Sequence, residues 1–149
     1  MDSQRVLLTA QGRELLQARI DEIAGQELPQ MRPLLVEDER DERVVADFER
    51  MQAEHDRLVV LLGTAGTIDP AELGAVVTLG SRVTITDAEG LERVVRIVDP
   101  VEAFLDEERI SSTSPLARAL MGRSVGDSAE VHAPAGTWTA TVTNVGGES

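Results

Sequence analysis

The chain has 149 residues, a formal net charge of −13 and only 2% aromatic residues, so we expect a core of aliphatic side chains. The negative charge repels phosphate backbones, which disfavours direct binding to free nucleic acid and favours a basic protein surface or a metal ion as partner. The absence of cysteine excludes disulfides, thiolate zinc sites and cysteine nucleophiles.

The N-terminal third predicts a helix that begins after Thr9, which we expect to act as its N-cap. Gly25 and Pro29 interrupt the helix and predict a kink or a local break, because Pro29 lacks a backbone donor and restrains Leu28 away from helical geometry. An apolar stripe runs along one face on both sides of this interruption: Leu16, Ile20, Ile23, Ala24, Leu28, Met31 and Leu35.

The next segment predicts a second helix whose apolar positions alternate in steps of four and three residues, the period of a coiled coil. The positions are Val44, Phe48, Met51, His55, Leu58 and Leu62. Two stripes of similar length joined by a charged turn predict an antiparallel helical hairpin.

The periodicity changes after the turn-rich residues 63–70. Residues 83–86 and 94–98 read as strands around a turn at 87–90, and residues 129–132 and 137–145 form a second hairpin around 134–136. We therefore predict an α+β fold, with an antiparallel coiled-coil finger in residues 1–72 and a mostly antiparallel β domain with one short helix in residues 73–149.

Residues 110–127, Ile-Ser-Ser-Thr-Ser-Pro-Leu-Ala-Arg-Ala-Leu-Met-Gly-Arg-Ser-Val-Gly-Asp, are the most informative part of the chain. They predict a strand end, a Ser/Thr-rich cap, a short helix with Pro115 at its first position and a stop at Gly122. The order of these residues resembles the signature of the Gre family of bacterial transcript-cleavage factors, which bind RNA polymerase. The resemblance extends over nearly the whole chain and includes Leu8-Thr9, Val76 to Val83 and Glu102-Ala103.

The resemblance implies a coiled-coil finger followed by a domain similar to FK506-binding proteins. In the family, this domain docks on the rim of the polymerase secondary channel, and the finger reaches toward the catalytic magnesium. The docking loop carried over to this chain consists of Ile110, Ser111, Ser114, Pro115, Leu116 and Ala117. Leu116 is expected to be its apolar anchor.

At the expected finger tip, the sequence departs from the family pattern of cleavage-active members. It carries the candidate acids Glu37, Asp38, Glu39, Asp41 and Glu42. They form either a solvated loop or a metal-binding tip that shares a magnesium ion at Asp38 and Asp41 with the polymerase. No tightly bound cofactor or intrinsic metal site is expected. Each arm is judged about one turn short, roughly 5 Å of lost reach.

Three functions follow from these observations. The first is an elongation regulator at the polymerase secondary channel, with or without stimulation of cleavage, and the second is a Gre-like inhibitor without cleavage activity. The third is a prolyl isomerase. Such enzymes usually have a pocket lined by aromatic residues, and Phe104 and Trp138 alone are few for that purpose. We expect an accessory factor rather than an enzyme. We also expect a cytoplasmic monomer that meets nucleic acid only within the transcription complex and binds no membrane.

Overall fold

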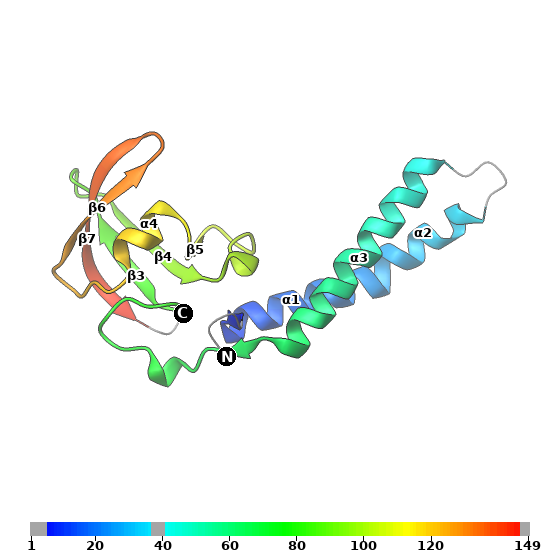
Figure 1. The fold of residues 1–149 in the computed structure, drawn as a ribbon, viewed down its shortest axis with the longest axis horizontal. Coiled ribbons are helices and arrows are strands. Elements are labelled where there is room, and N and C mark those ends of the chain that lie inside the picture. Colours follow the sequence, from blue (N-terminus) through cyan, green and yellow to red (C-terminus); the bar gives the residue numbers. More distant parts are fainter. Residues whose placement is uncertain (1–5, 37–40, 147–149) are drawn as a thin grey trace. The chain divides into compact units, whose positions relative to one another are not determined.

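The computed structural model describes residues 6–36 and 41–146, which form two compact units. One unit holds residues Ala10–Gly66, and the other holds Leu7–Thr9 together with the chain from Thr67 onward. The first is a helical hairpin and the second contains a curled β-sheet (Figure 1). The predicted mixed fold is confirmed at this level. The assignment of residues 1–72 and 73–149 as domains stays a prediction.

The first arm of the hairpin is helical from residue 10 to residue 35. It consists of α1 (Ala10–Glu22), the π-helical segment η2 (Ile23–Glu27) and α2 (Leu28–Leu35). Leu16, Ile20, Ile23 and Leu28 are buried, and Met31 and Leu35 are half-buried. These six members of the predicted apolar stripe therefore face the second arm.

Two expectations about this arm are corrected. Leu28 is not driven out of helical geometry by Pro29, since its φ and ψ are −64° and −44° and its backbone N–H donates to the Ile23 carbonyl. The interruption takes the form of a wider turn, which keeps the chain helical across Gly25 and Pro29. Ala24 lies exposed, because that wider turn moves it off the buried side.

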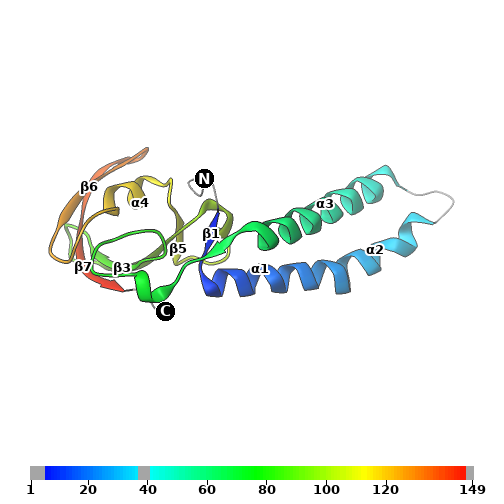
Figure 2. The same cartoon turned by 60° about the horizontal axis from the view of Figure 1, so that its bottom comes forward.

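The second arm is the uninterrupted helix α3 (Glu42–Thr64), which runs alongside α1 and α2 in both views (Figures 1 and 2). All six predicted seam positions are half-buried, as expected for a two-helix hairpin that covers only one side of each helix. Near the open end of the hairpin, the Arg13 guanidinium donates to the carbonyls of Leu62 and Ala65, at 2.9 and 2.8 Å.

Two short strands, β1 (Leu7–Leu8) and β2 (Gly66–Thr67), pair as a separate two-stranded sheet. The Ile68 amide donates to the Leu8 carbonyl at 2.8 Å, and Leu8 is fully buried. A single turn of 3-10 helix, η3 (Pro70–Glu72), follows, and the Asp69 carboxylate caps it by accepting from the Ala71 amide. The sequence interpretation placed only a turn-rich joint in this region.

The larger sheet has five strands in the order β5-β4-β3-β7-β6. Their bounds are β3 (Arg82–Thr86), β4 (Glu92–Val98), β5 (Arg109–Ser111), β6 (Ser128–Ala133) and β7 (Gly136–Gly146). All pairs are antiparallel except β4 with β5. The turn between β3 and β4 is closed by Asp87, which accepts from the amides of Glu89 and Leu91, and by Gly90 at φ +83°. Both predicted hairpins are confirmed.

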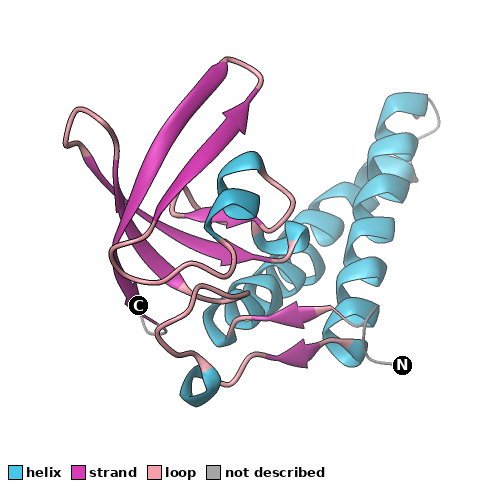
Figure 3. Cartoon of the chain, turned by 60° about the vertical axis from the view of Figure 1, so that its left-hand side comes forward, coloured by secondary structure: helices cyan, strands magenta, loops and turns pink. Residues whose placement is uncertain are grey.

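The helix α4 (Pro115–Leu120) lies against the curled sheet (Figure 3), and a 3-10 turn, η4 (Pro100–Glu102), follows β4. The core between sheet and helix is aliphatic, with Trp138 only partly buried at its margin. Its buried members are Val77, Val83, Ile85, Val95, Ile97, Leu116, Ala117, Leu120, Val131, Ala140 and Val142. Within the described ranges, no helix is both long and apolar enough to cross a bilayer.

Candidate functional site

The segment from β5 to α4 is built by local hydrogen bonds between its own polar side chains and backbone. The Ser111 hydroxyl accepts from the Thr113 amide at 3.1 Å, and the Ser114 hydroxyl accepts from the Ala117 amide at 3.3 Å. Pro115 occupies the first helical position, where its missing donor costs no hydrogen bond. Gly122, at φ +83°, follows the helix end. The predicted capped helix is confirmed.

The six candidate docking residues divide between the surface and the core. Pro115 is exposed, and Ile110, Ser111 and Ser114 are half-buried. Leu116 and Ala117 are only 8% and 0% exposed and belong to the aliphatic core. The expectation of Leu116 as an apolar surface anchor is therefore corrected, because the buried side of α4 carries it toward the sheet. A binding role for the loop as a whole stays a prediction.

A buried polar cluster lies directly before this segment. The Glu102 carboxylate accepts from the amide and the hydroxyl of Thr9, at 2.8 and 2.6 Å, and from the Arg109 Nε at 3.4 Å. The Glu102 and Arg109 side chains are 0% and 2% exposed. Arg109 also pairs with Asp106. Glu102 and Arg109 are buried opposite charges joined by a hydrogen bond, and Thr9 donates two more hydrogen bonds to Glu102. These contacts hold η4 against the start of β5.

Arg109 also belongs to a row of three arginines from neighbouring strands. Arg82 is opposite Arg96 across β3 and β4, and Arg96 is opposite Arg109 across β4 and β5. Burial lowers the pKa of Arg96, whose Nη1 donates to the Gly80 carbonyl at 2.9 Å. The Arg82 Nε donates to Glu108 at 2.6 Å. Sequence reasoning missed both the cluster and the row, although Thr9, Arg82 and Glu102 stood in stretches that the resemblance had singled out.

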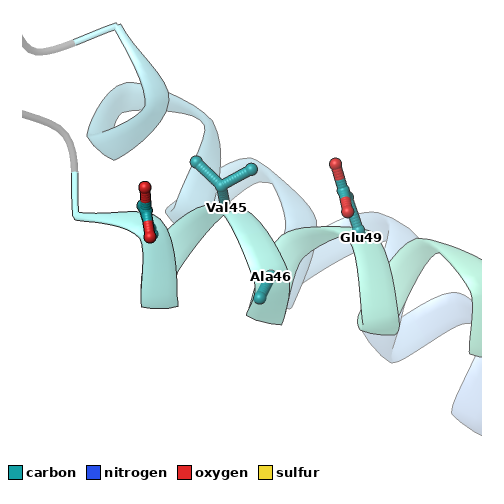
Figure 4. Close-up of a pocket in the computed structure, with 4 residues that line it drawn as sticks. Val45, Ala46 and Glu49 are labelled. Carbon is teal, nitrogen blue, oxygen red and sulfur yellow. The ribbon is translucent and has the colours of Figure 1, made fainter.

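The described part of the finger tip begins at Asp41, whose carboxylate caps α3 by accepting from the Arg43 amide at 2.8 Å. Glu42 lines a shallow hollow with Val45, Ala46 and Glu49, and Figure 4 shows Val45 and Glu49 on the same side of α3. The other candidate acids, Glu37, Asp38 and Glu39, lie outside the described residues.

No three histidine, aspartate or glutamate side chains in residues 6–36 and 41–146 come together as a metal site. The magnesium predicted at Asp38 and Asp41 is therefore neither supported nor tested, since Asp38 lies outside these ranges. Asp41 uses one carboxylate oxygen in the cap of α3.

The two aromatic residues that the isomerase alternative invokes have different surroundings. Phe104 follows η4 and is 70% exposed. Trp138 lines a hollow on the sheet together with Ile85, Asp87, Leu91, Glu92 and Arg93. Phe104 is not among the residues that line this hollow, so Trp138 alone supplies its aromatic surface.

The protein is thus of a two-part class, a helical hairpin followed in the chain by a curled β-sheet with one short capped helix. Residues 72–146 match the family model described as the C-terminal domain of transcription elongation factor GreA/GreB. The transcription elongation factor GreA of Thermotoga neapolitana is 33% identical over 142 residues, which cover 89% of this chain and 91% of that protein. The chain therefore belongs to the GreA/GreB family of bacterial transcription elongation factors.

Other relatives match over a shorter stretch. The transcription elongation factor GreA of Cereibacter sphaeroides is 44% identical over 80 residues, so the chain spans about half of that relative, 53% of its length. Among solved structures, GreA factor homolog 1 of Thermus thermophilus is 28% identical, with a TM-score of 0.43 over 95% of this chain and 99% of that chain.

Proposed function

We propose that this chain binds RNA polymerase at the rim of the secondary channel and that its finger enters the channel. There it obstructs the channel instead of accelerating RNA cleavage. The C-terminal unit, of the FK506-binding-protein-like type implied by the resemblance, is the part that docks. The protein then acts in the cytoplasm as an accessory factor, and any RNA cleavage is performed by the polymerase.

The observation that carries the proposal is the docking segment, residues 110–127, which lies wholly within the family match at residues 72–146. Its caps and its buried side hold the loop in one conformation before binding. Such preorganisation reduces the entropy lost on association. Pro115 is the candidate residue that combines exposure with a fixed backbone, so we assign it the central contact.

The inhibitory form is supported by the finger tip. Cleavage needs carboxylate oxygens that converge on a second metal ion and a water molecule. One carboxylate oxygen of Asp41 already accepts a hydrogen bond in the cap of α3, so it is less available to a metal ion. The nearby Glu42 and Glu49 line a hollow with Val45 and Ala46. Asp38 and Asp41 are the proposed ligands if a polymerase-bound magnesium is shared. The arms are judged about one turn shorter than those of the family. A shorter finger supports obstruction of the channel at a greater distance from the catalytic magnesium.

Substitution of Pro115 by arginine is expected to weaken binding to core RNA polymerase by about tenfold or more, because a bulky charge replaces a central contact. The affinity is measured with the full chain and purified core enzyme. Thr139→Arg is the matched control, since it adds the same side chain at an exposed position of β7.

Equal affinities of Pro115→Arg and Thr139→Arg would contradict the assigned docking surface, and no binding by the parent chain would contradict the proposed function. An acidic substitution at Leu116 is unsuitable for this purpose. Its side chain is buried in the core, so the variant would report on folding rather than on docking.

A further inference from the structure

The apolar stripe of the first arm contains one step that a regular helix cannot follow. The steps from Leu16 to Ile20 to Ile23 are four and three residues, but the next buried position is Leu28, five residues on. Five residues of α-helix turn the chain by about 500°, about 140° beyond one full turn, which would carry Leu28 away from α3. The π-helical segment η2 absorbs the extra residue and returns the stripe to the seam.

This wider turn has little local support from the sequence. Gly25 lies within it, and glycine is about 1 kcal/mol less favourable than alanine in a helix. A Cβ atom at Gly25 would meet no atom of the neighbouring side chains or of the opposite arm within 4 Å, so packing does not require the glycine. Pro29, one residue after Leu28, also removes a backbone donor. The turn therefore needs stabilisation from outside the backbone.

Arg19 supplies contacts on both sides of the turn. Its Nη1 donates to Glu27 at the end of η2, at 2.9 Å, and lies 3.4 Å from Glu22. Its Nε and Nη2 donate to the two carboxylate oxygens of Glu54 on α3, at 3.0 and 3.3 Å. One guanidinium thus connects α1, the last residue of η2 and the opposite arm.

These ion pairs differ from ordinary surface pairs, which contribute little to stability. The side chains of Arg19, Glu27 and Glu54 are only 28%, 31% and 36% exposed. The Arg19 guanidinium also binds the Glu54 carboxylate through two parallel hydrogen bonds. The hydrogen bonds that Arg19 donates to Glu54 raise the pKa of Arg19, and Glu27 adds to this effect, so the guanidinium stays charged. The Met51 sulfur also lies 3.6 Å from Nη2.

We propose that Arg19 is a positioning residue that holds the π-helical turn closed against α3 and thereby fixes the direction in which α2 carries the finger tip. The conformational part of this inference stands by itself, and only the expected effect on the polymerase channel rests on the proposed function. The contacts of Arg19 with Glu27 and Glu54 form this clamp. Without it, η2 exchanges between helical registers, and α2 moves relative to α1. Binding through the C-terminal unit is unaffected, whereas obstruction of the channel is weakened.

The conformational test places spin labels on cysteines introduced at the exposed positions Glu14 and Arg32, on either side of η2. The natural chain has no cysteine, so both labels are specific. Arg19→Met is expected to broaden the distribution of distances between the labels. Arg19→Lys keeps the positive charge but cannot bind Glu54 in a bidentate way, so it is expected to broaden the distribution less. Arg50→Met is the matched control, because Arg50 pairs with Asp47 on the exposed side of α3.

A rescue experiment separates positioning from a general loss of stability. Deletion of Gly25 removes the extra residue, so the stripe becomes continuous and the clamp is no longer needed. Arg19→Met is then expected to leave the distance distribution narrow. Deletion of Ala53, one exposed residue of the uninterrupted α3, is expected to give no rescue.

The inference is overturned if Arg19→Met leaves the distances unchanged, or if deletion of Gly25 fails to rescue it. Should Arg19→Met unfold the finger, Glu27→Ala decides the matter, because it removes only the contact across η2 and keeps the grip on Glu54.

In the polymerase assay, Arg19→Met is expected to lower the extent of obstruction at saturating protein by about twofold or more and to change the affinity for polymerase by less than about twofold. A parallel loss of affinity would overturn the positioning role. The label distances are measured without polymerase, so they decide the inference even if the proposed function fails.

Discussion

Replacement of Glu102 by alanine is expected to destabilise the C-terminal unit by about 3–5 kcal/mol, the usual cost of removing one partner from a buried ion pair. The substitution would leave the Arg109 guanidinium, 2% exposed, without its buried carboxylate, and would also remove the acceptor of the Thr9 amide and hydroxyl. The ion pair of Arg109 with Asp106, whose side chain is 41% exposed, would remain.

Denaturant unfolding followed by fluorescence measures this effect in the full chain. The sequence contains one tryptophan, Trp138, and no tyrosine, so the fluorescence reports on the C-terminal unit alone. Glu130→Ala is the control, since Glu130 is an exposed carboxylate of β6 in the same unit. It is expected to change stability by less than about 0.5 kcal/mol.

The double variant Glu102→Ala with Arg109→Met tests the physical reason. An apolar side chain leaves no buried charge behind, so the double variant is expected to lose less stability than the sum of the two single variants. Additive losses would show that the two charges do not interact. A loss for Glu102→Ala as small as that for Glu130→Ala would show that the cluster contributes nothing to the fold.

The second large effect is expected in transcription. When the protein and magnesium are added to a stalled, backtracked complex, the rate of RNA cleavage is expected to change by less than about tenfold, or 1.4 kcal/mol of barrier. Addition of nucleotides by an active complex is expected to slow, because the finger occupies the channel through which substrate enters. Both rates are measured on the same polymerase preparation, from the lengths of the labelled RNA.

The double variant Asp38→Ala/Asp41→Ala is expected to keep this obstruction, whereas Pro115→Arg is expected to lose it at concentrations that suffice for the parent chain. Rapid release of short 3′ RNA fragments that disappears in the Asp38→Ala/Asp41→Ala variant would replace the inhibitor with a working cleavage factor. Cleavage that persists in that variant would place the reactive groups elsewhere.

Sequence patterns predicted the elements whose cause is local. The seam of α3 follows from one uninterrupted helical period, and the β3–β4 turn follows from Asp87 and Gly90 within one short loop. The docking segment was predicted in detail for the same reason: Ser114, Pro115 and Gly122 act on backbone groups a few residues away. Such interactions join groups that are close together in the chain, so a sequence pattern can indicate them.

The same patterns were less successful for groups that depend on helix register. The sequence marked Gly25 and Pro29 as an interruption but could not indicate that a π-helical turn would keep Leu28 helical and buried. It also assigned Leu116 to the surface, because a helix of six residues is too short for its periodicity to tell the buried side from the exposed one.

The sequence alone determined the family and the order of the main helices and β-hairpins, since both depend on residues close together in the chain. Only the tertiary structure decided which charges meet. Thr9 and Glu102 are 93 residues apart, and the row of Arg82, Arg96 and Arg109 exists because strand pairing brings three separate segments into register. A side chain in a linear sequence carries its charge but not its distance to a partner, and burial makes that distance decisive.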